Sequence, residues 1–445
     1  MAEVVVDRSV PVFAAANLAV LGLLVLVGAP GAAGLVAVAV VVPLATAVAE
    51  RPQLGLLVLA ALVPFDGLLL IVPHAGFVEG WKEFLVLLTF GATLFASPAA
   101  RGPTRLPRPV WVSAAAALIG LALLSCLFVG GFQALIGIKV GFFYALVGVA
   151  AWRCPLDARE RDRLVSILMA GGFATAVYGL LQQVMGGDRL NQLGYAFNET
   201  IRFSGDRLRS FSSFNQPFPF AFFLVLVILV GLPVALGDRA RLRNQLFVIS
   251  LPVLSLALAS TVVRGAWLAL AVGGGFLAAQ RHRALFLLLP PALALMAFLP
   301  PDLASPAFHA SSTNERVSSW RANISRVVDN PLGLGVGATG AAAEKSAGTG
   351  EDTYQPDNYY FKTVLELGLV GLWLLGLLYA GAFASTRLSA ARLAGQDGAL
   401  ALGVAGSVAS VAAASVVATY LEIFPMDLYF WLLLAVVARC DPESP

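Results

Sequence analysis

Long apolar stretches follow one another along nearly all of this 445-residue chain, and they constrain its fold more than any other feature. A helix needs about 20 mostly apolar residues to cross the hydrocarbon core of a bilayer, where the backbone must satisfy its own hydrogen bonds. Charged residues make up only 12% of the chain and hydrophobic residues 59%. The sequence therefore predicts one all-α integral membrane domain over residues 1–445, and it argues against a soluble or nucleic-acid-binding protein.

The predicted fold is a polytopic bundle of about 14 transmembrane helices, within a range of about 12–14. In the first half of the chain the candidate spans are 11–28, 31–49, 53–72, 82–96, 110–129, 134–151 and 164–185. In the second half they are 217–236, 245–262, 264–280, 284–299, 358–381, 399–419 and 423–438. The first span lacks a small-residue cleavage site after it, which favours a signal anchor over a removed signal peptide.

The positions of the basic residues predict the orientation. If the N-terminus is cytoplasmic and the spans alternate, more than half of the Lys and Arg residues fall on the cytoplasmic side, and the short outer loops 29–31, 130–133 and 420–424 hold none. This is the positive-inside pattern of bacterial membrane proteins. An even number of spans then places both termini in the cytoplasm.

Two longer outer loops, 186–216 and 300–357, run against this bias because they also carry arginines. Either long loops are weakly governed by the rule, or the outer face binds an anion. Within 300–357, a capping-box pattern at Ser312–Glu315 and apolar residues at helical spacing predict a short amphipathic helix that ends at Asn330-Pro331. This helix either lies on the outer membrane interface or packs on the bundle. Arg316 and Arg321 on this helix either bind an acceptor or lie on its polar surface. The glycine-rich residues 332–337 that follow could present backbone N–H groups to a phosphate.

Three polar clusters interrupt the apolar background on the predicted outer face, at 207–217, 260–265 and 354–360. Arg264 is the most informative residue, since a cation at membrane depth costs about 2.5–3.5 kcal/mol unless it is paired or functional. It could instead extend to the interface from the end of its span. Arg209 could be a solvated loop charge, and Asp357 could be a helix N-cap.

Two arginines and one aspartate form a coherent chemical set. Guanidinium groups bind phosphate oxygens bidentately, and a carboxylate can accept the proton of an attacking hydroxyl group. Arg209, Arg264 and Asp357 would therefore suit glycosyl transfer from a lipid-linked pyrophosphate, with the arginines stabilising the departing group and no metal required. The scattered Cys and His residues predict no metal site, and no cofactor motif is present. Lys362 and Glu366, one turn apart on the predicted span 358–381, could form an ion pair.

The polar clusters resemble the O-antigen ligase and polymerase superfamily of bacterial envelope enzymes. The segment Arg209–Pro217 is similar to the family's Arg-x-x-Gly/Ser-Thr-Phe-x-x-Pro motif, and Ser260–Gly265 to its Thr-x-Ser-Arg-Gly span start. The run from Arg316 to Gly337 resembles the family's outer-loop signature. Asp357 to Gly371 resembles its His-Asn-x-x-Leu…Glu-x-Gly-x-x-Gly element, with Asp357 in place of the usual histidine. The resemblance covers about residues 200–380, and the first half of the chain matches only as generic spans.

This resemblance implies a metal-independent glycosyltransferase in the bacterial inner membrane, with its active site facing the periplasm. Its partners would be a polyprenyl-pyrophosphate-linked glycan, a glycan or lipid acceptor, and membrane lipid. Arg209, Arg264 and Asp357 would be catalytic. We expect substrate binding by a further set: Arg207, Arg316, Arg321, Asn358, Tyr360 and Glu366. Because Asp357 replaces the histidine of ligases, the interpretation leans towards a polymerase of repeat units, with a ligase acting on a lipid A core or another acceptor as the alternative.

Two other classes of function remain open at this stage. A transporter of an anionic solute or lipid would need polar residues deep in several spans, and the main candidates are Asp66, Lys139, Gln182 and Gln183. Lys139 could instead contact lipid headgroups or pair with a carboxylate. A structural or assembly protein without chemistry would leave the outer arginine clusters unexplained.

Overall fold

The computed structural model describes residues 41–72, 76–96, 109–197, 200–281, 324–347 and 356–440. The predicted spans 11–28 and 284–299, most of 31–49 and most of the loop 300–357 lie outside these ranges. Of the predicted amphipathic helix only 324–329 is described; it is helical and ends before Asn330, as the Asn-Pro pair predicts.

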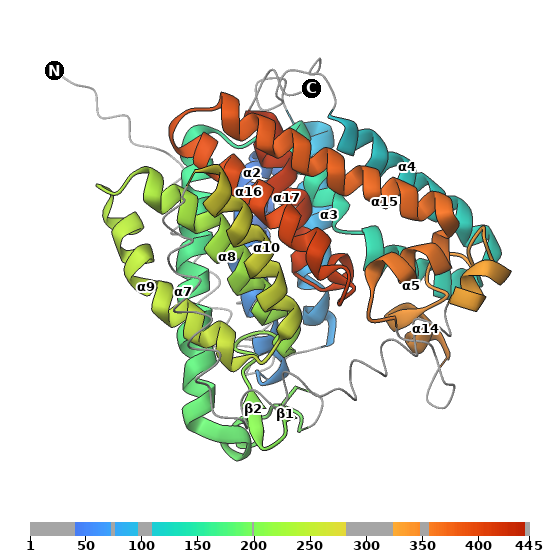
Figure 1. The fold of residues 1–445 in the computed structure, drawn as a ribbon, viewed down its shortest axis with the longest axis horizontal. Coiled ribbons are helices and arrows are strands. Elements are labelled where there is room, and N and C mark those ends of the chain that lie inside the picture. Colours follow the sequence, from blue (N-terminus) through green and yellow to red (C-terminus); the bar gives the residue numbers. More distant parts are fainter. Residues whose placement is uncertain are drawn as a thin grey trace, which may run out of the picture.

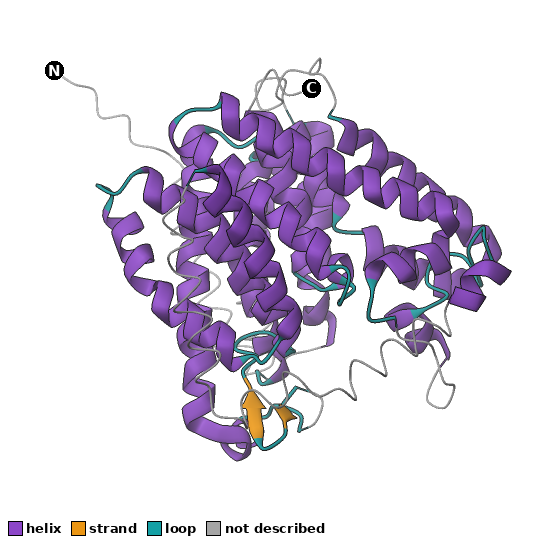
Figure 2. Cartoon of the chain, viewed as in Figure 1, coloured by secondary structure: helices purple, strands orange, loops and turns teal. Residues whose placement is uncertain are grey.

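Helices form almost the whole of the described chain, and the only two strands there make a small hairpin (Figure 2). The longer helices of the first part are α2 (Pro52–Leu62), α3 (Trp81–Phe95), α4 (Val110–Ser125), α5 (Gly131–Phe142), α6 (Ala145–Arg153) and α7 (Ala158–Gln192). After the hairpin come α8 (Pro217–Gly237), α9 (Leu242–Ser260), α10 (Arg264–Gln280), the short α14 (Gly340–Ala347), α15 (Tyr359–Arg392), α16 (Gly395–Ala414) and α17 (Met426–Cys440). Short 3-10 helices extend the bundle at Val63–Leu70 (η1), Gly76–Gly80 (η2), Cys126–Phe128 (η3) and Tyr420–Glu422 (η5).

Each predicted span between residues 53 and 280, and between 358 and 438, corresponds to a helix or a bent helix pair. Seven helices of the described residues are long and apolar enough to cross a membrane, or eight if the pair α5–α6, bent by 52°, is one span. The chain is therefore an all-α polytopic membrane protein, whereas the predicted total of about 14 spans is not confirmed.

The bundle is built around α8, α16 and α17. Nearly all of α8 is apolar. In its most apolar 18-residue stretch 83% of the residues are buried, against 33% in the corresponding stretches of α4 and α9. A helix that is apolar on all sides is expected in the interior of a bundle, whereas one with exposed apolar faces meets lipid. In Figure 1, α7 and α9 lie on one side of this centre, and α4, α5 and α15 on the other.

The connections between the helices are divided between the two ends of the bundle. The connections α8–α9 and α15–α16 lie at the upper end in Figure 1, where Arg161 pairs with Asp397 at 2.7 Å and Arg241 with Asp162 at 2.6 Å. The hairpin lies at the opposite, lower end. This division matches the one that the positive-inside pattern predicts, while the orientation in a membrane stays a prediction.

Candidate functional site

The site is built on the hairpin that follows α7. Strands β1 (Arg202–Ser204) and β2 (Arg207–Arg209) pair antiparallel around Gly205, whose φ of 60° suits a tight turn. The register sets Arg202 directly opposite Arg209. Directly opposite residues of an antiparallel pair carry their side chains on the same face. The hairpin therefore brings two guanidinium groups together. The third hairpin arginine, Arg207, is exposed at the turn.

The residues after β2 enter the protein core, where α7 fixes their backbone. The buried Gln182 side chain accepts hydrogen bonds from the backbone N–H groups of Phe211 and Ser212, at 3.1 and 2.7 Å, and donates to the Ser212 carbonyl at 2.9 Å. Gln183 donates to the Leu208 carbonyl at 2.9 Å. These bonds satisfy a buried irregular segment that could not otherwise enter an apolar bundle. They also determine where β2 ends.

The hairpin and the α9–α10 turn meet at Arg209. Its Nε donates to the Thr261 carbonyl at 3.0 Å, and its guanidinium lies 5.0 Å from the centre of the Phe218 ring. A backbone hydrogen bond of 3.1 Å from Ser210 to Ser260 joins the same two segments. Two of the three polar clusters found in the sequence are therefore adjacent in the structure. Arg264, half-buried, is the first residue of α10.

The electrostatics of this site favour an anion. Burial, together with the positive charges of Arg202 and Arg264, lowers the pKa of Arg209 to about 10, which still leaves it protonated at neutral pH. Among the described residues no carboxylate forms an ion pair with Arg209. We call Arg202, Arg209 and Arg264 the arginine cluster. Like charges held together at a partly buried site are unfavourable, and a ligand carrying several negative charges would relieve their repulsion.

The third polar cluster lies at the start of α15. Here the N-cap is Asn358, whose side-chain oxygen accepts hydrogen bonds from the N–H groups of Tyr360 and Phe361. The alternative that Asp357 caps this helix is therefore wrong. Asp357 is exposed. The Tyr360 hydroxyl group donates to the Ala412 carbonyl at 2.8 Å.

The C-terminal end of α16 connects this cluster with the arginine cluster. The Tyr359 N–H group donates to the Ser415 carbonyl at 2.8 Å. From the other side, Gly265 approaches so closely that a Cβ atom there would lie 3.0 Å from the Val417 side chain. The first residues of α10 and of α15 therefore lie on either side of residues 415–417. Arg264 is next to Gly265, which approaches Val417, and Asp357 is close to Tyr359, which bonds to Ser415.

A buried ionic network lies one to two turns further along α15. Lys362 pairs with Glu366 at 2.7 Å, which confirms the predicted ion pair, and with Glu422 at 3.3 Å. Glu366 also accepts hydrogen bonds from the N–H and hydroxyl groups of Thr339. The network joins α15, η5 and the segment before α14.

The glycine-rich residues 332–337 use their N–H groups inside the protein. Helix α15 is broken at Gly368, where φ is 68°, and the carbonyls of Leu365 and Glu366 accept from Leu334 and Gly335 at 2.8 and 2.9 Å. The Val336 N–H group donates to Ser125 at 3.0 Å. The N–H groups of Leu334, Gly335 and Val336 are therefore not presented to a phosphate, which was one possibility that the sequence left open. The segment instead donates hydrogen bonds to the carbonyl groups of α15 at its break.

With this geometry in place, the comparison with known families is informative. Residues 246–376, from α9 to the middle of α15, match the family described as O-Antigen ligase. This match supports the O-antigen ligase and polymerase superfamily for this part of the chain. No curated protein matches the chain. The O-antigen ligase match and the apolar helices together support a multi-pass bacterial inner-membrane enzyme of polysaccharide biosynthesis, one that transfers glycan in the manner of a ligase or polymerase.

The matched residues 246–376 include Arg264, Asp357, Asn358, Tyr360 and Glu366, whereas Arg207 and Arg209 precede them. The structure connects Arg209 to the matched residues by its hydrogen bond to the Thr261 carbonyl. Arg316 and Arg321 lie outside the described residues. Within the described chain, no three His, Cys, Asp or Glu side chains are grouped closely enough to hold a metal ion.

Sequence reasoning missed Arg202 as a member of the site, and it recognised Gln182 and Gln183 only as polar residues within a span. The signal for Arg202 was the Gly205-Asp206 pair, which is typical of a hairpin turn. Arg202 and Arg209 are placed nearly symmetrically about that pair. The role of the two glutamines depends on a contact between distant segments, so no local pattern reveals it.

Proposed function

We propose that the protein transfers a glycan from a polyprenyl-pyrophosphate carrier to an acceptor at the outer face of the membrane, and that it is a polymerase of repeat units. The observation that carries this proposal is the arginine cluster. It gathers three positive charges from the hairpin and the start of α10, and Arg209 is held in place by Thr261 and Phe218. The O-antigen ligase match makes glycan transfer the chemistry to expect there.

The cluster would act on the departing group. When the bond between the sugar and the pyrophosphate breaks, negative charge grows on the pyrophosphate oxygens. Guanidinium groups that are already in position stabilise this charge without reorganising, which is how preorganised donors lower a barrier. The fixed backbone of residues 210–213 and the hydrogen bond to Thr261 supply that preorganisation for Arg209. We propose that this stabilisation requires no metal ion.

Asp357 is our candidate for the group that accepts the proton of the acceptor hydroxyl. Its exposed carboxylate stands just before α15, so an acceptor can approach it from outside the bundle. The remaining predicted binding residues differ in their surroundings. Asn358, Tyr360 and Glu366 make the internal hydrogen bonds described above, and Arg207 is free to meet solvent. Their role in binding substrate stays a prediction.

The aspartate also motivates the choice of polymerase over ligase. Family ligases usually carry histidine where this chain has Asp357, so the acceptor side of the reaction differs while the arginines are retained. Transfer to a lipid A core or another acceptor is the alternative within the same chemistry.

Product analysis tests the choice. Purified protein in nanodiscs would receive lipid-linked repeat units from the host, with and without EDTA. A ladder of longer lipid-linked glycans that persists in EDTA and is lost in Asp357→Asn would support the proposal. The matched control is Asp188→Asn, an exposed aspartate at the end of α7. Product that forms only when a separate acceptor is added would contradict the polymerase and identify a ligase.

Transport is less well supported than transfer. Of the four deep polar residues that could have lined a pathway, Asp66 pairs with Lys82 at 2.6 Å and Lys139 with Glu83 at 2.9 Å. Gln182 and Gln183 bond to the backbone that follows the hairpin. All four therefore have partners within the fold.

A further inference from the structure

A groove between α7 and α9 combines an apolar wall with a charged end. It has a volume of about 800 Å³. Its apolar lining comes from one face of each helix: Met169, Ala170 and Phe173 of α7, and Leu246, Ile249 and Val253 of α9. Phe173 and Ile249 are 44% and 72% exposed. In a membrane-spanning bundle such an exposed apolar face meets lipid chains rather than water.

The charged end of the groove is formed by Arg243 and Ser166. Arg243 Nη1 donates to the Asp162 carboxylate at 2.7 Å and to the Ser166 hydroxyl group at 2.9 Å. Its other terminal nitrogen, Nη2, is buried and has no hydrogen-bond partner among the described residues. A buried charged donor without a partner is costly, so an acceptor atom at this position would stabilise the protein.

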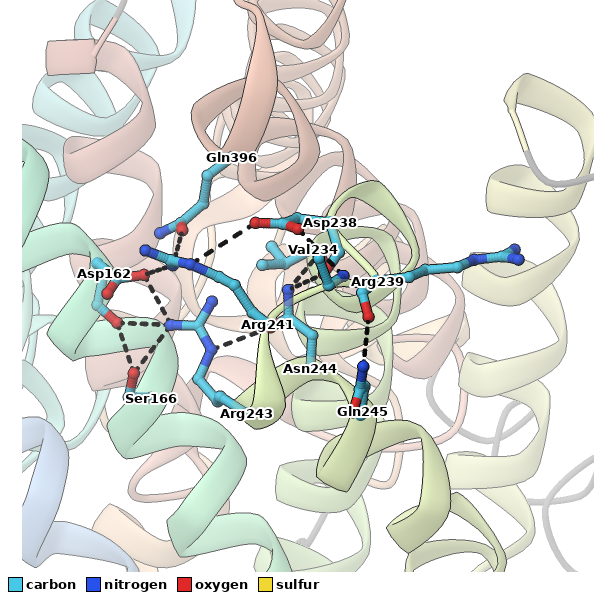
Figure 3. Close-up of polar contacts among 11 residues, drawn as sticks. Asp162, Ser166, Val234, Asp238, Arg239, Arg241, Arg243, Asn244, Gln245 and Gln396 are labelled. Carbon is cyan, nitrogen blue, oxygen red and sulfur yellow. Dashed lines mark hydrogen bonds and ion pairs between the residues drawn. The ribbon is translucent and has the colours of Figure 1, made fainter.

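Further arginines stand beside this end (Figure 3). Arg241 donates to Asp162 at 2.6 Å and to Gln396 at 3.0 Å. It lines a second cavity of about 480 Å³ together with Arg159 and Arg163, and the carboxylates there are Asp162 and Asp397. Arg241 also pairs with Asp238 at 3.6 Å, and Arg161 pairs with Asp397 at 2.7 Å. With these residues and Arg243 included, five arginines face three aspartates. The positive charge that remains is complementary to an anion.

We propose that this groove binds a membrane phospholipid with an anionic headgroup. An acyl chain would lie along the apolar wall between α7 and α9. The phosphate would accept hydrogen bonds from Arg241 and, once a small rotation of the Arg243 side chain exposes it, from Arg243 Nη2. Basic pockets between transmembrane helices on the cytoplasmic side are known to hold anionic headgroups, and the positive-inside pattern assigns this end to the cytoplasm. The site lies at the end of the bundle opposite the arginine cluster, and it does not depend on the proposed reaction.

Competitive lipid binding to the full-length protein tests this site. The protein in mild detergent would be titrated with phosphatidylglycerol and with phosphatidylcholine of the same chains, and bound lipid counted by native mass spectrometry. We expect phosphatidylglycerol to bind preferentially, with the preference falling about fivefold in Arg243→Gln and in Arg241→Gln. Arg239→Gln is the matched control. Arg239 belongs to the same loop, and its side chain extends away from Arg241, Arg243 and Asp162 (Figure 3).

A second variant separates lipid binding from any loss of folding. Ala170 is an exposed residue of the groove wall, so Ala170→Phe would fill the groove without touching a charge. We expect it to lower the amount of tightly bound phosphatidylglycerol, whereas Ala380→Phe, at an exposed site on α15, would not. Equal binding of the two lipids, or equal preference in the Arg243→Gln and Arg239→Gln proteins, would overturn the proposal. So would full binding in Ala170→Phe.

Discussion

At the scale of the residue, Gln182 shows how one side chain can position a site that it does not touch. Its amide group makes three hydrogen bonds to the backbone of Phe211 and Ser212, and it is fully buried. Gln182→Leu would leave these backbone groups without partners, at about 1–3 kcal/mol for each group left unsatisfied. We expect a clear fall in the thermal unfolding temperature in detergent. The control Gln192→Leu, at an exposed position of the same helix, should leave it unchanged.

The sequence predicted some residues of the site and not others, for identifiable reasons. Arg209 and Arg264 were found because each belongs to a short motif with an unusual charge for its place in the chain. Their proximity depends on the bond from Arg209 to Thr261, which joins segments 52 residues apart. Asp357 was placed at the start of the correct helix, but the capping role belongs to its neighbour Asn358. Two adjacent side chains that can both cap a helix are distinguished only by backbone geometry.

At the scale of the element, the break in α15 depends on a glycine. Gly368 has a φ of 68°, and a Cβ atom there would lie 2.5 Å from the Pro331 carbonyl oxygen. At Gly368 ψ is −171°, a conformation that is essentially restricted to glycine. Gly368→Ala should therefore destabilise the protein by more than the roughly 1–3 kcal/mol of such backbone strain, because the clash adds to it. Gly376→Ala, in the same helix with open space around it, should be neutral or slightly stabilising. Equal unfolding temperatures for the two variants would contradict this account of the break.

The glycine-rich residues 332–337 show why one possibility left open by the sequence does not hold. Its composition is typical of loops that cradle phosphates, and composition alone does not identify the acceptor. In this fold the acceptors are the carbonyls of Leu365 and Glu366, which the break at Gly368 leaves without helical partners. A break in a helix 34 residues long is not visible in its hydrophobic pattern, which runs through it unchanged.

Glu422 in η5 predicts a pH dependence of stability. Burial raises the pKa of its carboxyl group from an ordinary value of 4.5 to about 7, while the Lys362 charge opposes the rise. Between these values the folded protein holds a proton that the unfolded chain has released. The stabilising contribution is therefore complete below about pH 4.5 and is lost as the pH rises through about 7, by at most about 1.4 kcal/mol for each pH unit.

Thermal unfolding of Glu422→Gln checks this expectation. The amide cannot titrate, so its unfolding temperature should change less than that of the original protein between pH 5 and about 7. Glu79→Gln, which replaces an exposed glutamate, should retain the original pH dependence. Parallel pH profiles for the original protein and Glu422→Gln would show that Glu422 does not titrate in this range.

At the scale of the whole molecule, the spans were predictable and their packing was not. Apolar length identified the long helices within the described ranges, including α8, the most buried of the seven candidate spans. The pair α5–α6 was predicted as one span at 134–151, and the structure bends it by 52°. The placing of α8, α16 and α17 at the centre could not be deduced from order along the chain, because lipid and protein interior are equally apolar.

The orientation of the bundle is open to a direct test. The background is a protein in which alanine replaces Cys126, Cys154 and Cys440. One test variant, Asp206→Cys, places a cysteine on the hairpin, and the other, Arg239→Cys, places one on the α8–α9 connection. Both positions are exposed. A membrane-impermeant maleimide added to intact spheroplasts should label the first variant and not the second. Labelling of the second alone would invert the topology and place the arginine cluster in the cytoplasm.

The central claim is that the arginine cluster stabilises a departing lipid pyrophosphate. The most direct measurement is single-turnover release of polyprenyl pyrophosphate from the lipid-linked glycan, comparing the original protein with Arg209→Gln and Arg264→Gln. The matched control is Arg189→Gln, which removes an exposed arginine near the C-terminal end of α7, the end that leads into the hairpin. We predict release at least about 100-fold slower in both cluster variants, in line with the loss of a preorganised charge-stabilising group, and unchanged release in the control. Release at the original rate in Arg209→Gln or Arg264→Gln, from folded protein, would contradict the account.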